Sequence, residues 1–378
     1  MSFKSHKTIF LVSILGLVLA ACGAAPAQSW AGVAVSNETE TVYIANDTRL
    51  YSLSTDGQTL RWQQPSSSGT DDFFGLFGGG SSSSATPSVN LAPVFADPVV
   101  AGDLLIVSSY NKSVYGLNIK DGTQKWVFSQ SADRLIAPPA VQGKFVYVAS
   151  ADNSLYALDL ADGSLKWTFK TEASLWGAPV PTEEVIYVPS MDHNLYALAR
   201  DGSLIWKATL NGSLAGSPTL SEDGKTIYVG TLNDTLYALN TQGGGERWSI
   251  STQGWVWATP VVADGVVYFA DLEGSVFAYD STTGIEKWTT GIGGAVRGTP
   301  VIAGESLIVA VEEGLVYALS LTDGSKKWEH TIDGQNADRL LSNLLVIGDK
   351  VLIVPLAAEK LVYALKVSDG NEAWTYKP

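Results

Sequence analysis

Short apolar runs recur along the whole chain, and Gly, Asp or Asn separates each run from the next. In one representative unit the runs cover residues 260–262, 266–270, 275–280 and 286–290. No stretch shows helical periodicity long enough for a helical crossover between parallel strands. The pattern therefore predicts an all-β chain built from four-stranded antiparallel units.

Eight copies of one motif follow each other, and every copy ends at a tryptophan; one copy reads LYALDLADGSLKW. The eight tryptophans are Trp62, Trp126, Trp167, Trp206, Trp248, Trp288, Trp328 and Trp374. The first interval is 64 residues, which an insertion explains, and the others are 39 to 46 residues. A period near 40 fits one blade of a β-propeller and is too long for one turn of a β-helix.

The third run of each unit, such as residues 155–158, is apolar at consecutive positions. Alternate residues of a strand point to opposite faces, so both faces of this sheet are buried. Blades packed around an axis bury both faces of every sheet, and closure of the ring protects the sheet edges. We therefore predict an eight-bladed β-propeller over residues 30–378, with four antiparallel strands in each blade.

The tryptophans are predicted to dock each blade on its neighbour, because a buried indole contributes a large apolar area. A small residue in the third strand, such as Ala157, is expected to make room for a ring from a neighbouring blade. An Asp-Gly pair such as Asp162-Gly163 precedes most tryptophan strands. Two-residue turns need positive φ, which Gly adopts freely and Asp tolerates, so we expect a tight hairpin of this type.

The run Ala-x-Asp-x-x-x-Gly-x-x-x-Trp is complete at Ala157, Asp159, Gly163 and Trp167. It resembles the tryptophan-docking repeat of the PQQ-like (quinoprotein-type) β-propeller family, and the resemblance extends over nearly all of residues 30–378. The family includes quinoprotein dehydrogenases and a non-catalytic branch of membrane lipoproteins that assist outer-membrane protein assembly. Chain length, acidic balance and the N-terminal sequence make this chain similar to the second branch. The resemblance implies a scaffold for protein–protein interaction, although a fold does not by itself establish a function.

The dehydrogenase branch uses a pair of adjacent cysteines, a calcium ion and pyrroloquinoline quinone, whereas this chain contains one cysteine. Beyond residue 21 there are two histidines, His193 and His330, and one methionine, which disfavours haem ligation and a histidine-based zinc site. We therefore expect no catalytic, cofactor-binding or metal-binding residues, and no enzyme activity. A quinone- or sugar-dependent enzyme and a ligand-sensing lipoprotein of the same fold remain the alternatives.

An apolar run over residues 8–21 follows two lysines and ends in small residues before Cys22. The run is shorter than the ~20 residues that span a bilayer and is typical of a secretory signal peptide, here residues 1–21. Its end resembles the bacterial lipobox, which implies lipidation of Cys22 and a flexible tether over residues 22–29. The expected location is extracytoplasmic: on the outer membrane facing the periplasm where the cell has one, otherwise on the outer face of the cytoplasmic membrane.

The net charge of −14 disfavours nucleic-acid binding, which requires a basic surface that neutralises phosphates. We expect a monomer whose partners are proteins of the cell envelope.

Candidate binding residues lie before the prolines that open six of the units, where proline disturbs no ladder hydrogen bond. They are Arg134, Trp176, Trp257, Arg297 and Arg339. Trp176, Trp257 and Arg297 each precede such a proline by three residues, so we expect them to share one mouth, either as a binding surface or as channel-filling core. Acids between the second and third strands predict an acidic rim around this mouth: Asp47, Asp152, Asp192, Asp234, Asp271, Glu273, Glu312, Glu313 and Glu359. They are too dispersed in the sequence to define a metal site.

A low-complexity insertion covers residues 65–90, between the first and second blades. Serine and glycine tracts flank a phenylalanine-rich segment at residues 73–77. Such tracts bury too little surface to order themselves, which favours a disordered loop. The phenylalanines leave open a second hypothesis, a short motif that docks on a partner or on a membrane surface.

Overall fold

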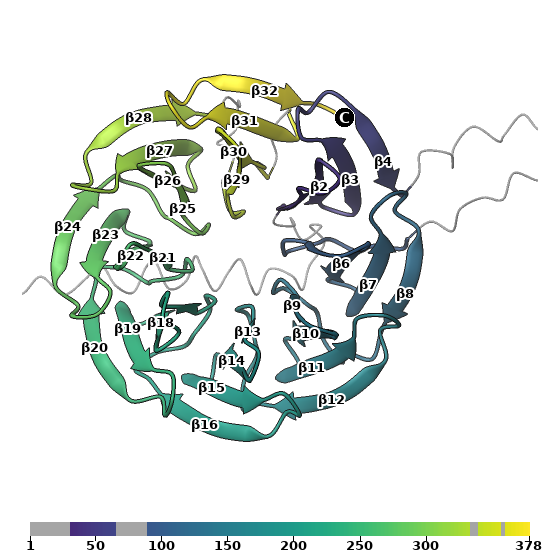
Figure 1. The fold of residues 1–378 in the computed structure, drawn as a ribbon, viewed down its shortest axis with the longest axis horizontal. Coiled ribbons are helices and arrows are strands. Elements are labelled where there is room, and N and C mark those ends of the chain that lie inside the picture. Colours follow the sequence, from purple (N-terminus) through teal and green to yellow (C-terminus); the bar gives the residue numbers. More distant parts are fainter. Residues whose placement is uncertain (1–30, 66–88, 333–338, 357–359) are drawn as a thin grey trace, which may run out of the picture.

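The computed structural model describes residues 31–65, 89–332, 339–356 and 360–378. It confirms the predicted fold: thirty-two strands form eight four-stranded antiparallel sheets arranged as blades around a central axis (Figure 1). Every regular element in these described ranges is a strand, and within them no helix has the length and apolarity needed to cross a membrane.

The strands follow one another in chain order within each blade. Blades 1 and 2 comprise β1 (Gly32–Ser36), β2 (Thr41–Asn46), β3 (Arg49–Ser54), β4 (Leu60–Gln64), β5 (Val99–Ala101), β6 (Leu104–Ser109), β7 (Ser113–Asn118) and β8 (Gln124–Phe128). Blades 3 and 4 comprise β9 (Ala140–Gln142), β10 (Phe145–Ala149), β11 (Ser154–Asp159), β12 (Leu165–Lys170), β13 (Val180–Pro181), β14 (Val185–Pro189), β15 (Asn194–Ala199) and β16 (Leu204–Thr209). Blades 5 and 6 comprise β17 (Thr219–Leu220), β18 (Thr226–Thr231), β19 (Thr235–Asn240), β20 (Glu246–Ser251), β21 (Val261–Ala263), β22 (Val266–Ala270), β23 (Ser275–Asp280) and β24 (Glu286–Gly291). Blades 7 and 8 comprise β25 (Val301–Ala303), β26 (Ser306–Ala310), β27 (Leu315–Ser320), β28 (Lys326–Thr331), β29 (Leu345–Ile347), β30 (Lys350–Ile353), β31 (Val362–Lys366) and β32 (Glu372–Tyr376).

The first strand of each blade lies nearest the axis and the fourth lies at the perimeter (Figure 1). Each opening proline stands directly before a first strand, as Pro139 does before β9 and Pro260 before β21. Second and third strands are almost completely buried, and their side chains form a separate apolar cluster between each pair of blades. Both faces of the inner strands are therefore covered, which is the physical reason for their unbroken apolar runs.

Each repeat tryptophan packs against a turn of the following blade. Trp126 is 6% exposed and donates its indole N–H to the Leu160 carbonyl at 3.0 Å. Its ring lies on Gly163, where a Cβ would be 2.5 Å from the ring. The corresponding glycines under the eight rings, beginning with the one under Trp62, are Gly122, Gly163, Gly202, Gly244, Gly284, Gly324, Gly370 and Gly57. The last contact, Trp374 on Gly57, joins blade 8 to blade 1 and closes the ring.

Two details of this docking differ from the expectations. Ala157 lies directly opposite Trp167 in the β11–β12 register, so the small residue accommodates the ring of its own blade rather than a neighbour's. The turn is also wider than two residues, because the Asp159 N–H donates to the Ser164 carbonyl across four intervening residues. Within it Gly163 has a φ of 70°, whereas Asp162 is not among the positive-φ residues and accepts the Ser164 N–H on its carboxylate at 2.9 Å.

Several sequence predictions concern residues outside the described ranges. These are the signal peptide at residues 1–21, the tether at 22–29 with Cys22, most of the insertion at 65–90, and Glu359. At the end of that insertion Val89 is described, is 3% exposed and packs in the cluster that contains Trp62. Val89 therefore belongs to the apolar core between blades 1 and 2, although it lies within the predicted insertion.

Candidate functional site

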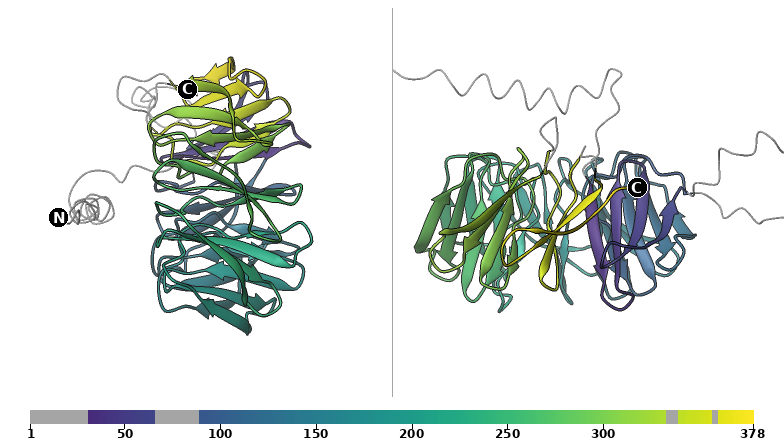
Figure 2. Two further views of the ribbon diagram at one scale, coloured as in Figure 1. Left: turned by 90° about the vertical axis from the view of Figure 1, so that its left-hand side faces the viewer. Right: turned by 90° about the horizontal axis from the view of Figure 1, so that it is seen from above.

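Where the structure describes them, the connections between blades lie on one face of the ring, which we call the mouth face (Figure 2). Each connection approaches the next first strand with alternating burial, as in Leu175, Trp176 and Gly177. Leu175 is fully buried between blades, whereas Trp176 is partly exposed and turns toward the axis. This alternation is the ordinary consequence of an extended backbone.

A pocket at the axis is lined by residues from the same position of successive blades. The position lies three residues before the opening proline, or before its equivalent Leu344 in blade 8, and is occupied by Phe95, Ile136, Trp176, Ala215, Trp257, Arg297 and Leu341. The cavity measures about 90 Å³, which is room for a few water molecules. The repeat therefore brings together residues that are far apart in the sequence.

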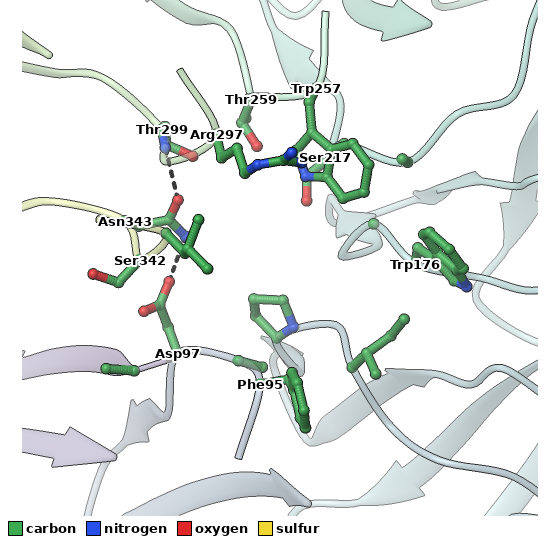
Figure 3. Close-up of a pocket in the computed structure, with 18 residues that line it drawn as sticks. Phe95, Asp97, Trp176, Ser217, Trp257, Thr259, Arg297, Thr299, Ser342 and Asn343 are labelled. Atoms are coloured by element: carbon green, nitrogen blue, oxygen red, sulfur yellow. Dashed lines mark hydrogen bonds between the residues drawn. The ribbon is translucent and has the colours of Figure 1, made fainter. Parts of the chain in front are cut away.

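Trp176 and Trp257 both line this pocket and lie next to each other on the side away from Asp97 and Asn343 (Figure 3). Their ring centroids are 6.2 Å apart and the ring planes are inclined by 48°. Blade 5, which lies between their blades, contributes only Ala215 at this level, and its methyl group leaves room for the two rings. The pair forms an apolar, aromatic wall of the kind that is enriched in binding hot spots.

A guanidinium group completes this wall. The Cζ atom of Arg297 lies 5.3 Å from the centroid of the Trp257 ring, a cation–π arrangement. Its Nε donates to Glu312 at 2.7 Å, and Arg339 donates to the other oxygen of the same carboxylate. The side chains of Arg297 and Glu312 are 16% and 15% exposed, and burial lowers the pKa of the arginine below its usual value.

Asp97 forms a second polar centre on the pocket wall. It accepts the Val33 N–H at 3.0 Å and the Asn343 amide at 2.5 Å, and Asn343 in turn accepts the Thr299 N–H at 2.8 Å (Figure 3). Burial raises the pKa of the Asp97 carboxyl, against the opposing effect of these two donors. The chain of bonds connects blades 1, 2, 7 and 8, so it holds the ring together where its ends meet.

The five predicted mouth residues separate into two groups. Trp176, Trp257 and Arg297 line the axial pocket, and Arg339 joins them through Glu312. Arg134 does not belong to this group, because its guanidinium bonds to the Tyr110 hydroxyl at 2.9 Å and lies over that ring, away from the pocket-lining residues. The sequence reasoning missed the lining residues Phe95, Ile136, Asp97 and Asn343, although the first two share the proline register that identified the tryptophans.

The predicted acidic rim is only partly an exposed surface. Glu273 and Glu313 are exposed, but Asp271 is completely buried and accepts the N–H groups of Glu273 and Ser275. Asp152 accepts from the Tyr156 hydroxyl at 2.6 Å and from the Ala132 N–H at 2.7 Å. Asp271 and Asp152 therefore stabilise the loops of the mouth face through hydrogen bonds, in addition to any role in hydrating its surface.

The bonds of Asp152 predict a pH dependence of stability. Burial alone would raise the pKa of this carboxyl, but the bonds from Tyr156 and Ala132 outweigh burial and lower the pKa. The folded-state pKa thus lies below the ~3.9 of an unfolded aspartate, so the contribution to stability is present above about pH 4 and is lost as pH falls through the folded-state value. Urea unfolding below about pH 5 should show a weaker pH dependence for Asp152→Asn than for the unmodified chain. Equal slopes for the two proteins would contradict this assignment.

The pocket does not fit the cofactors of the family's dehydrogenases. Its volume of about 90 Å³ lies below the ~300–1,000 Å³ of typical small-molecule sites. Asp97 is the one carboxylate among the lining residues, and both of its oxygens already accept hydrogen bonds. Among the described residues no group of three or more His, Cys, Asp or Glu side chains could hold a metal ion.

Comparison with known proteins identifies the family. The family model described as "Outer membrane protein assembly factor BamB" matches residues 20–137, 130–200, 192–335 and 268–377. BamB of Salmonella typhimurium is 33% identical over 96 residues, a match that covers 23% of this chain and 24% of that protein. The chain thus matches about a quarter of the length of this curated relative.

Two solved structures share the fold. The crystal structure of BamB from Moraxella catarrhalis superposes with a TM-score of 0.69 at 16% identity, covering 86% of this chain and 93% of that one. The computationally designed Ika8 protein superposes with a TM-score of 0.73 at 13% identity, covering 90% and 96%. Because the family model matches nearly the whole chain, this protein belongs to the family of the outer membrane protein assembly factor BamB.

Proposed function

We propose that this protein is a non-catalytic scaffold, anchored to a bacterial membrane through Cys22, that binds extended polypeptide partners at its mouth face. The observation that carries the proposal is the aromatic wall of Trp176 and Trp257, held on a rigid ring and bordered by Arg297. Aromatic side chains and arginine provide large contact area and dominate binding energy at protein interfaces. The family match supports a role in outer-membrane protein assembly, the process for which its members are named.

The same geometry argues against the enzyme alternative. The charges nearest the pocket are already engaged, since Glu312 accepts from Arg297 and Arg339 while Asp97 accepts from Val33 and Asn343. Neither carboxylate is placed as a free general base. Adding pyrroloquinoline quinone and calcium to the purified protein should therefore leave the absorbance spectrum of the quinone unchanged. A stoichiometric spectral shift would favour the enzyme instead.

A triple substitution tests the binding site. Trp176→Ala, Trp257→Ala and Arg297→Ala together should abolish capture of envelope proteins in a pull-down from detergent-solubilised membranes, because they remove the wall and its cation. The matched control replaces three residues on the opposite face, Asp223, Lys225 and Gln242, with alanine, and should leave capture intact. Capture that survives the mouth substitutions in a folded triple variant would contradict a binding role for these side chains.

Cys22→Ser tests the anchor. The variant should lose incorporation of labelled palmitate and should appear unprocessed or in the soluble fraction, because the lipidated thiol is absent. Palmitate labelling that persists in the variant would show that Cys22 is not the site of attachment.

A further inference from the structure

The outer strand of blade 4 exposes two adjacent apolar side chains. Leu204 and Ile205 of β16 are 49% and 50% exposed. In each of the other seven blades, at least one of the two residues directly before the repeat tryptophan is charged. These pairs are Leu60-Arg61, Gln124-Lys125, Leu165-Lys166, Glu246-Arg247, Glu286-Lys287, Lys326-Lys327 and Glu372-Ala373. Blade 4 therefore differs from the other blades by the absence of charge at this point of its perimeter.

A β-bulge places Ile205 on the surface. In the β15–β16 register Trp206 lies opposite Ala197. Leu204 lies opposite Leu198, so Ile205 between them has no opposite residue. The same bulge occurs in every blade, and its extra residue is a lysine or an arginine in six of them and an alanine in blade 8. Charged side chains on edge strands, lysine above all, oppose pairing with another chain. Ile205 thus stands where most blades carry a protective cation.

The outer side of β16 is an open sheet edge. The strand is the last of the order β13-β14-β15-β16, and in the part of the chain that the structure describes no strand pairs with its outer side (Figure 1). Beyond the bulge, the stretch from Trp206 to Thr209 pairs regularly with β15. Alternate N–H and C=O groups of this stretch therefore point outward. Unpaired groups of an edge strand are a template for a further extended chain, so the edge fits a strand rather than a helix.

The charge beside this edge is positive. The outer strands of blades 3 and 4, β12 and β16, contain three lysines and no acid, although the net charge of the chain is −14. These lysines are Lys166, Lys170 and Lys207. Lys166 pairs with Asp159 at 3.1 Å, whereas Lys207 forms no ion pair with any described residue. Asp201 lies in the turn before β16, at the other end of the strand from Lys207. Because opposite charges across neighbouring strands attract, the regular stretch of β16 favours a carboxylate on an added strand.

We propose that the edge of β16 is a second binding site, at which an extended acidic segment of another polypeptide adds to blade 4 as a fifth strand. Apolar side chains of the segment cover Leu204 and Ile205, and one of its carboxylates pairs with Lys207. The site lies on the perimeter and depends neither on the mouth nor on Cys22. A contact of one short strand buries little area, so the complex is weak and readily reversed.

A photoreactive peptide tests this site. The probe is an octapeptide with blocked ends in which valine and glutamate alternate and one central valine is replaced by photoleucine. After irradiation with the full-length protein in detergent solution, mass spectrometry should map the cross-links to residues 203–209. Cross-links confined to other parts of the chain would overturn the proposal.

One substitution removes the distinctive feature of blade 4. Ile205→Lys should reduce cross-linking several-fold, because it restores the protective cation of the other blades. The variant should fold normally, since the same bulge carries lysine in blades 2, 3, 6 and 7, and circular dichroism checks this. The matched control Lys287→Gln, at the same position of blade 6, should leave cross-linking to β16 unchanged. Undiminished cross-linking in folded Ile205→Lys would contradict the assignment.

Two further peptides separate backbone pairing from charge. An octapeptide of the same sequence, N-methylated at its four central residues, keeps the side chains but cannot donate hydrogen bonds from either edge, so it should not be cross-linked. An octapeptide with lysine in place of glutamate should be cross-linked several-fold less. Equal cross-linking by the methylated peptide would overturn strand addition, and equal cross-linking by the lysine peptide would overturn the acidic class of partner.

Two remaining outcomes distinguish this site from other occupants and from the mouth. Sedimentation of the full-length protein should show no dimer that Ile205→Lys dissociates; such a dimer would assign the edge to a second copy of the chain instead. The triple variant of Trp176, Trp257 and Arg297 should be cross-linked at β16 as strongly as the unmodified protein. Loss of cross-linking in that variant, if folded, would show that the peptide binds through the mouth and would overturn a separate site.

Discussion

Replacing Trp126 with alanine is expected to lower the free energy of unfolding by about 3–5 kcal/mol. The ring is 6% exposed and fills the space between β8 and the turn of blade 3 that ends at Gly163. Truncation would leave a cavity between blades 2 and 3. It would also leave the Leu160 carbonyl without its donor, the indole N–H at 3.0 Å. Chemical unfolding followed by circular dichroism would measure the loss.

Two companion variants separate the causes of this loss. Trp126→Phe keeps an aromatic ring and removes the hydrogen bond, so it should cost less than the alanine variant. Gly163→Val places a branched side chain where a Cβ would already be 2.5 Å from the Trp126 ring and where φ is 70°, so it should be as damaging as removing the ring. A neutral effect of Gly163→Val would refute the docking described here.

Glu312→Ala is expected to be the most destabilising single change on the mouth face. The substitution leaves Arg297 and Arg339 beside each other without the carboxylate that both contact. Removing one partner of a buried ion pair costs about 3–5 kcal/mol, and the partial exposure of these side chains should place the loss somewhat below that range. Thermal unfolding at neutral pH and low ionic strength would measure it.

The neighbouring residue supplies the control. Glu313 is exposed one position further along the same turn, so Glu313→Ala should change the free energy of unfolding by less than about 0.5 kcal/mol. Replacing Arg297 by leucine together with Glu312→Ala should recover part of the loss, because one unpaired charge is removed. Equal effects of Glu312→Ala and Glu313→Ala would show that the two arginines find other partners.

The repeat could be predicted closely because its signal is local. The unit expected at residues 260–290 matches β21 to β24 to within one residue at each end. Trp176 and Trp257 both stand three residues before a proline, and this spacing correctly predicted that they share one location, since both line the pocket. By contrast, Arg134 stacks on Tyr110, a contact between separate loops that no spacing in the sequence reveals. The burial of Asp271 could not be predicted either, since its turn reads like the exposed acidic turns of other blades.

The sequence by itself determined the number of blades, their four strands and the tryptophan that docks each one. These features follow from hydrophobic periodicity, glycine conformation and the area of an indole, which act within about 40 residues. Only the tertiary structure decided which carboxylates are free and which are committed, because that depends on donors contributed by other blades. Asp97 shows the difference. In the sequence it is only an acidic residue before a proline, but closure of the ring brings it to Asn343, 246 residues away. The hydrogen bond between them joins the two ends of the propeller.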